Sequence, residues 1–361
     1  MSDFEYLISL LRSLLKNQPP EELPESCDFG RVFALAQRHS VAGMAYYAAE
    51  ALKAPPSGEI SAQWRLIRDK AIVKDITQQS ELEAIGSAFT AAGVRFLPLK
   101  GSIIKRLYPQ SDMRTMSDID LLIDEGNAGK ARDIMEKLGY SCENFGYDVH
   151  DIYYKRPVMN VEIHRELFGE EGQEFRRVFG DPWRLCVRGE GTRCCFSDSA
   201  FFAYVLAHAI KHLEEGGTGI RTITDLWVCL NSGMNIDPEE SLRLLEGSGK
   251  EGEARRLIGL SRVWYDGAPH TEETLSLEQY ILGSGTYGTF NNLAANQIRR
   301  SGRAGYLFRL IFPTFTHMRQ HYPVLKKAPM LLPACWLARL VTKPFINRRQ
   351  NAAKLKAIIK K

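Results

Sequence analysis

Acidic residues are missing from the C-terminal part of this chain of 361 residues. From Gln279 to Lys361 there is neither aspartate nor glutamate, whereas the same segment holds 15 lysines and arginines. Since the whole chain carries a formal charge of only +4, the residues before Gln279 are net negative. This asymmetry favours a basic tail that meets an anionic partner. Because aromatic residues alternate with basic ones there, three interpretations stay open: a solvated face, a nucleic-acid surface or a membrane-surface patch.

Cysteine motifs and long apolar runs are also absent. The seven cysteines form no C-x-x-C pair and no zinc spacing. The first residues carry acids rather than a basic stretch, so export is not expected. Together these features predict reduced thiols and a cytoplasmic location. No run of 18 apolar residues occurs, which predicts no transmembrane segment.

The order of apolar patterns predicts an α+β fold with a small mixed sheet and helical regions before and after it. Apolar residues recur at helical spacing before residue 92, most clearly in a long run over 60–91. Short strand patterns then alternate with helical ones, in an order that fits a mixed sheet with helices on one side. We expect four parts: a helical region at 1–92, the sheet core at 93–198, a helical domain at 199–300 and the basic helical segment at 301–361.

Two aspartates separated by one apolar residue mark the strand pattern at 119–123. Side chains of a strand alternate between its faces, so Asp118 and Asp120 project from one face while Ile119 enters the core. Two carboxylates this close repel each other unless a cation lies between them, and Mg²⁺ with its oxygen ligands is the usual one. The pattern is typical of a metal-dependent site for nucleotidyl transfer.

Residues on either side supply the other groups that such a transfer needs. A Gly-rich turn that opens a helix suits the binding of a triphosphate, and Gly101 with Ser102 forms such a turn. Glu162, flanked by Val161 and Ile163, is an acid on a later strand and is predicted as the third metal ligand and as a candidate base. Cations near the turn would offset phosphate charge. The predicted nucleotide-binding set is Lys100, Gly101, Ser102, Arg114 and Ser117.

These motifs resemble those of the DNA-polymerase-β-type nucleotidyltransferase superfamily. Within it, Leu99-Lys-Gly101, Leu107-Tyr-Pro109, Asp118-Ile-Asp-Leu-Leu-Ile123 and Val161-Glu-Ile-His164 are similar to a family of uncharacterised bacterial nucleotidyltransferases. The resemblance covers about residues 30–345. It implies that 93–198 is the catalytic core and that 199–300 is the acceptor domain.

The resemblance also implies that two later helical elements form the side of the site that binds the acceptor. They are a His-x3-His element at His208 and His212, and a Gly-x-Arg-x3-Asp element with Arg221 and Asp225. The histidines lie one helical turn apart, but no third ligand at suitable spacing accompanies them, which favours packed or hydrogen-bonded side chains over zinc. For Arg221 and Asp225, at i and i+4, a plain intrahelical ion pair is the default interpretation, and a contact of Arg221 with substrate is the alternative. His164 is predicted to orient a neighbouring group.

The predicted activity moves a nucleoside monophosphate from a nucleoside triphosphate to an acceptor and releases pyrophosphate. It requires Mg²⁺ or Mn²⁺ at Asp118, Asp120 and Glu162. The acceptor stays open among sugar, peptide, protein and RNA, and the base is not specified by any motif. Two alternatives remain: a catalytically silent nucleotide-binding or regulatory module, and an RNA-directed, toxin-like transferase that uses the basic tail.

Overall fold

A computed structural model describes residues 1–143, 145–146, 149–157, 159–169, 172–286 and 288–346. The chain divides into two compact units. The first comprises Met1–Lys211 and Gly219–Thr286, and the second comprises His212–Thr218 and Tyr287–Lys361. Each unit is described by itself.

The first unit begins with four helices, as the apolar spacing predicts. Ser2 caps the first of them in a capping box, because its side chain accepts a hydrogen bond from Glu5 N while the Glu5 side chain accepts one from Ser2 N. The longest helix covers the predicted run over 60–91. The helices are α1 (Asp3–Leu15), α2 (Phe29–Arg38), α3 (Ala42–Glu50) and α4 (Gly58–Ala91).

A mixed sheet of five strands follows, in the order β1-β2-β5-β4-β3. Strands β2 and β5 are parallel, and the other neighbours are antiparallel. The strands are β1 (Phe96–Pro98), β2 (Ile119–Ile123), β3 (Ser141–Glu143), β4 (His150–Lys155) and β5 (Met159–His164), and helices α5 (Lys100–Ile104) and α6 (Ala128–Lys137) lie between them in the chain. The predicted α+β class with a small mixed sheet is confirmed.

The turn after β1 differs from the prediction in detail. The sequence pattern places the start of a helix at Ile103, whereas α5 already begins at Lys100 and continues as a 3-10 helix over Lys105–Leu107. Tyr108 then adopts extended backbone angles, with φ −76° and ψ 157°. Pro109 accounts for this end, because a residue before proline is disfavoured in the helical region.

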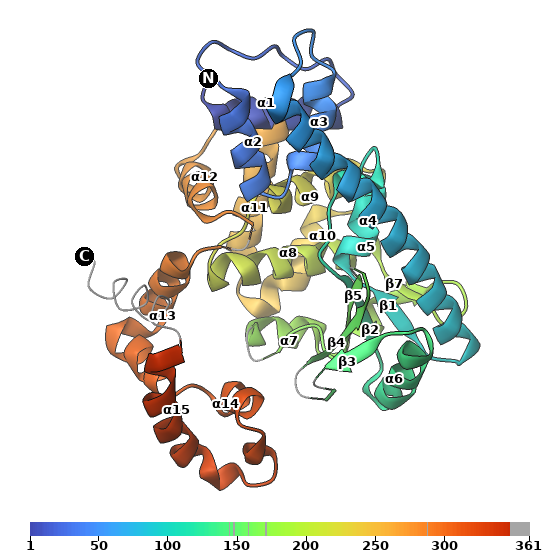
Figure 1. The fold of residues 1–361 in the computed structure, drawn as a ribbon, viewed down its shortest axis with the longest axis vertical. Helices are drawn as coiled ribbons and strands as arrows, with labels where there is room; N and C mark the ends of the chain where they lie inside the picture. The colour runs from blue at the N-terminus through green and yellow to red at the C-terminus, as the bar shows by residue number, and fades with distance from the viewer. Residues whose placement is uncertain (144, 147–148, 158, 170–171, 287, 347–361) are drawn as a thin grey trace. The chain divides into compact units, whose positions relative to one another are not determined.

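One face of the sheet packs against α4 and α6. Strand residues Leu121 and Ile163 are fully buried there, and they meet Ile85 and Phe89 of α4 and Met135 of α6. Figure 1 shows that α4 passes beside the sheet and that α6 lies near the lower end of α4. Because side chains alternate along a strand, the residues between these core positions project to the opposite face. The polar face that results carries Asp120, Glu162 and His164.

The remainder of the first unit is mostly helical. A hairpin of β6 (Cys186–Arg188) and β7 (Cys194–Phe196), which the sequence reasoning missed, lies between the first of these helices and the others. Arg12 Nε of α1 donates to Trp264 O at 2.7 Å, which joins the N-terminal helices to the later ones. The helices are α7 (Gln173–Phe179), α8 (Asp198–Glu215), α9 (Ile220–Asn231), α10 (Pro238–Leu245), α11 (Glu251–Asp266) and α12 (Glu272–Ser284), of which the last four residues of α8 belong to the second unit.

The second unit is helical, as the sequence predicts for its basic segment at 301–361. Its helices are α13 (Phe290–Ile311), α14 (Phe315–His321) and α15 (Leu332–Ile346). Gly302, at φ 69°, interrupts the helical geometry of α13. Met318, Leu325 and Cys335 form a small core. Among the described residues of the whole chain, no helix combines the length and the apolar character that a membrane span needs.

Candidate active site

Two of the predicted acids face each other on neighbouring strands. Asp120 of β2 lies directly opposite Glu162 of β5 in the parallel register. Asp120 is 8% exposed, and Glu162 is half-buried. Asp118 precedes β2 by one residue and is also half-buried. All three lie at the polar face of the sheet, where the alternation of side chains places them.

Lys100 and His164 hold the Asp120 carboxylate. Lys100 Nζ lies 3.3 Å from Asp120 Oδ2, and His164 Nε2 lies 3.0 Å from Asp120 Oδ1. Lys100 Nζ is also 2.7 Å from His208 Nε2 of α8. The sequence predicted that His164 orients a neighbour, and its contact with Asp120 agrees with that role.

The pKa values of the three acids reflect their burial, the repulsion between them and the cations beside them. Burial and the charge of Asp120 raise the pKa of Asp118. Burial, together with the charges of Asp120 and Asp118, raises the pKa of Glu162 to about 7. Burial also opposes ionisation of Asp120, but Lys100 and the hydrogen bond from His164 outweigh it, so the pKa of Asp120 is lowered. Carboxylate oxygens are donors that Mg²⁺ and Mn²⁺ prefer.

The turn at the start of α5 brings Lys100, Gly101 and Ser102 next to these acids. The Leu99 backbone N–H donates to Asp120 O at 3.0 Å, which fixes the turn to β2. A Cβ on Gly101 would lie 2.7 Å from Met116 Sδ, so a larger residue here would displace the Met116 side chain. Ser102 Oγ is buried, and no described residue gives it a hydrogen-bond partner. Ser117 is exposed at the rim, where Lys74 Nζ donates to its carbonyl oxygen at 3.1 Å.

Arg114 and Asp225 form a buried ion pair. The Arg114 guanidinium donates to both Asp225 oxygens, at 2.9 and 2.8 Å, and Tyr108 Oη donates to Asp225 Oδ1 at 2.7 Å. Both partners of the pair are less than 10% exposed. Arg221 donates to Thr115 O at 2.9 Å. These contacts fix helix α9 to the segment that leads into Asp118.

The histidines predicted on α8 fall in different units. His208 lies beside Lys100 in the first unit, whereas His212 belongs to the second, where its Nδ1 is 3.5 Å from Glu215 Oε2. The sequence reasoning missed His150, the first residue of β4, which pairs in register with His164. Its Nε2 lies 3.6 Å from Glu162 Oε2. The signal that could have found it is alternation along two antiparallel strands, and the strand was expected to begin only at residue 151.

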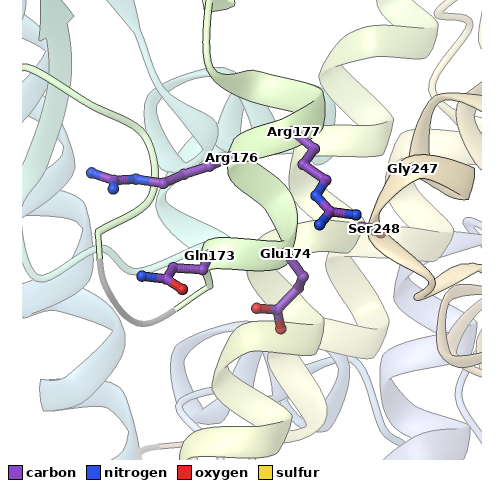
Figure 2. Close-up of a pocket in the computed structure, with 6 residues that line it drawn as sticks. All are labelled: Gln173, Glu174, Arg176, Arg177, Gly247 and Ser248. Atoms are coloured by element: carbon purple, nitrogen blue, oxygen red, sulfur yellow. The ribbon is translucent and has the colours of Figure 1, made fainter.

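A pocket of about 450 Å³ lies elsewhere in the first unit (Figure 2). Its lining combines Arg177, Glu174 and neighbouring polar groups of α7 with Gly247 and Ser248. Figure 2 shows Arg177 directed toward Ser248, while Arg176 extends to the other side of the helix. None of the predicted site residues lines this pocket.

No curated protein sequence matches the chain. Among solved structures, the chain is similar to the antibiotic-resistance factor ANT(2'')-Ia, whose solution structure reveals substrate-regulated conformation dynamics. The identity is 16%, the match covers 50% of this chain and 96% of that one, and the TM-score is 0.36. Residues 25–265 match the model of a family described as uncharacterised nucleotidyltransferase. The chain therefore belongs to this family, and its general activity is nucleotidyl transfer.

Proposed function

We propose that this protein moves a nucleoside monophosphate group from a nucleoside triphosphate to an acceptor, with release of pyrophosphate. The observation that carries the proposal is the register that sets Asp120 against Glu162 on two parallel strands, with Asp118 beside them. Burial and the neighbouring acids raise the pKa of Asp118 and of Glu162, which is unfavourable for folding, so a role that requires these acids accounts for their presence.

In this proposal Asp118, Asp120 and Glu162 hold Mg²⁺ or Mn²⁺. When bound, such a cation would offset the negative charge that develops on the phosphoryl oxygens and on the leaving pyrophosphate. The Lys100 ammonium, 3.3 Å from Asp120, adds positive charge at the same place. The electrostatic contribution of fixed cations is typically large in a site shielded from water.

The triphosphate would lie against Lys100, Gly101 and Ser102, with Ser117 at the rim. The buried Ser102 hydroxyl, which has no partner among the described residues, supports a hydrogen bond to a ligand oxygen. Arg114 would act indirectly and not by contact with the nucleotide, because its guanidinium is hydrogen-bonded to Asp225. Its pair with Asp225 would hold the segment that presents Ser117 and Asp118.

The chemical step then needs a proton acceptor. The acceptor oxygen attacks the α-phosphorus, a new P–O bond forms, and the bond to the bridging oxygen breaks with its electron pair leaving on pyrophosphate. The Glu162 carboxylate would take the proton of the attacking hydroxyl. Its pKa of about 7 suits a base that operates near neutral pH.

The identity of the acceptor is a separate part of the proposal. His208 beside Lys100, with Arg221 of α9, would border the acceptor. Asp225 of the predicted set would act through its pair with Arg114, and no role is proposed for His212, which belongs to the second unit. Sugar, peptide, protein and RNA acceptors all contain a suitable oxygen nucleophile.

All seven cysteines are free thiols, which supports a reducing, cytoplasmic compartment.

Incubation of the protein with α-labelled triphosphates, Mg²⁺ and cell extract tests the proposal. We expect one class of extract molecule to become labelled, and D120N to abolish the labelling. D124N is the matched control, because Asp124 follows the same strand but pairs with Arg95 at the surface. Nucleotide binding without pyrophosphate release would instead support a silent regulatory module, and label in RNA alone would support the RNA-directed alternative.

A further inference from the structure

Two histidines and a glutamate gather on the polar face of the sheet. His150 of β4 lies directly opposite His164 of β5, and Glu162 precedes His164 by two residues. Residues two apart on a strand share a face, and directly opposite residues of an antiparallel pair do as well. One ligand atom from each of the three side chains lies within 4.8 Å of the other two.

The spacing of these atoms suits a single cation. His150 Nε2 and His164 Nε2 each lie 3.6 Å from Glu162 Oε2. Ligands bound at about 2.0–2.1 Å to a tetrahedral ion are about 3.4 Å apart. Small rotations would therefore bring the three atoms into coordination. The side chains are 13–26% exposed, so an ion could reach them from solvent.

We propose that His150, Glu162 and His164 form a site for a transition-metal cation of the Zn²⁺, Co²⁺ or Mn²⁺ type. Imidazole nitrogen is a ligand that these ions accept readily, whereas Mg²⁺ prefers oxygen donors. His164 Nε2 lies 3.0 Å from Asp120 Oδ1, and coordination of the ion would replace this contact. The site uses Glu162 in common with the magnesium site, and only this shared use rests on the proposed function.

Binding measurements on the full-length protein test the site without reference to catalysis. In equilibrium dialysis with Zn²⁺, we expect H150N and H164N each to bind at least tenfold more weakly than the wild type. Added Co²⁺ should give the visible absorption of a nitrogen-ligated ion, and that absorption should be lost in H150N. Mg²⁺ binding should be unchanged in H150N.

H270N provides the matched control. His270 Nε2 also lies 3.6 Å from a glutamate oxygen, that of Glu278, but outside the three-residue group. Its substitution should leave the Zn²⁺ affinity unchanged, and circular dichroism checks that each variant folds. Equal Zn²⁺ affinity in the wild type, H150N and H164N overturns the proposal, as does a Co²⁺ spectrum unaffected by H150N. Because transfer is not measured, failure of the proposed function would not alter these results.

A second, independent observation concerns apolar side chains in the second unit. Of the sixteen large apolar residues that the described chain exposes, nine lie between Leu307 and Val341. Leu337, Leu340 and Val341 share one face of α15 at helical spacing, and Met330 before that helix is 85% exposed. Such a concentration exceeds the scattered apolar residues of an ordinary surface.

Basic residues accompany this apolar surface. Arg303, Arg309 and Lys327 are exposed, and no acid follows Glu278 in the sequence. We infer that the second unit binds the surface of an anionic phospholipid bilayer, with its apolar side chains inserted and its cations against the headgroups. Aliphatic side chains such as Leu337 and Val341 cannot stack on bases, so RNA would leave them unused.

Vesicle flotation tests this inference. The full-length protein should float with vesicles of phosphatidylcholine and phosphatidylglycerol but not with phosphatidylcholine alone, and added salt should weaken the binding. V341S should bind several-fold more weakly, whereas V73S should not, although Val73 in the first unit is 66% exposed and Val341 69%. Binding equal in both variants, no flotation, or binding to RNA in place of vesicles would overturn it.

Discussion

The two faces of the five-stranded sheet differ in what their side chains do for the protein. The face against α4 and α6 is lined by apolar residues such as Leu121 and Ile163, each at most 1% exposed. The opposite face presents Asp120, Glu162 and His164 from the same two strands. Burial of the first set stabilises the fold, since each large apolar side chain contributes about 1.5–3 kcal/mol. In the second set, burial and the neighbouring acids oppose ionisation of Glu162, whereas Lys100 and His164 stabilise the charge of Asp120.

This difference teaches which substitutions should separate stability from activity. A change on the apolar face should act through the free energy of unfolding. A change among the acids should reduce transfer, and loss of the Glu162 charge should also make the metal-free fold more stable at alkaline pH. Four variants test the division.

The largest effect is expected for D120N. Loss of a cation ligand that also pairs with Lys100 removes several kcal/mol of transition-state stabilisation, which corresponds to a decrease of about 10³-fold in rate. Initial rates of label transfer measure it. A D120N rate within tenfold of the wild-type rate would contradict the assignment.

D225N tests a buried polar group that we assign to structure. It removes the carboxylate that both Arg114 nitrogens contact, and leaves the Arg114 charge buried without its partner. Loss of one partner of a buried pair costs about 3–5 kcal/mol. Urea denaturation measures the change. D181N is the control, since its pair with Arg184 is exposed and should contribute about 0–1 kcal/mol.

L121A tests the apolar face. Leu121 is fully buried between the sheet and its helices, so the substitution should lower the free energy of unfolding by about 2–5 kcal/mol. L66A, on an exposed position of α4, makes the same change and should cost less than about 0.5 kcal/mol. Equal effects of the two variants would contradict the placement of the core.

E162Q should stabilise the metal-free protein at alkaline pH. Folding raises the pKa of Glu162 from 4.5 to about 7, so the folded state binds the proton more tightly than the unfolded state. Stability is therefore lost as pH rises from 4.5 through 7, and the substitution removes that loss. We expect a gain of about 1–3 kcal/mol at pH 8 and almost none at pH 4. Denaturation in the presence of a chelator at both pH values measures it, and a destabilised E162Q at pH 8 would contradict the account.

Local sequence patterns predicted the strands that carry this site, whereas tertiary contacts determine which strands and side chains become neighbours. Alternation along 119–123 and 158–164 placed Asp120 and Glu162 on one side of their strands, because period two is a property of the strand itself. The same logic does not show that β2 and β5 are neighbours, which depends on the topology of the sheet. The sequence therefore predicted the acids but did not predict their register.

Arg114 illustrates what spacing along the chain cannot show. Its nearest acid in sequence is not its partner, since Asp225 lies 111 residues away on α9. Asp225 was expected to pair with Arg221 as its neighbour at i and i+4, whereas it accepts hydrogen bonds from Arg114 and Tyr108. His150 was missed for a similar reason, because its place opposite His164 follows from a pairing between strands.

Pyrophosphate release by the purified wild-type protein tests the central claim most directly. Each of the four ribonucleoside triphosphates, with the acceptor fraction that becomes labelled, is incubated with Mg²⁺ or with a chelator. The account predicts release that needs both the triphosphate and the cation, and that falls to background in D118N but not in D124N. Release that persists in the chelator, or is equal in D118N and the wild type, would contradict the assignment of the polar face as the site of transfer.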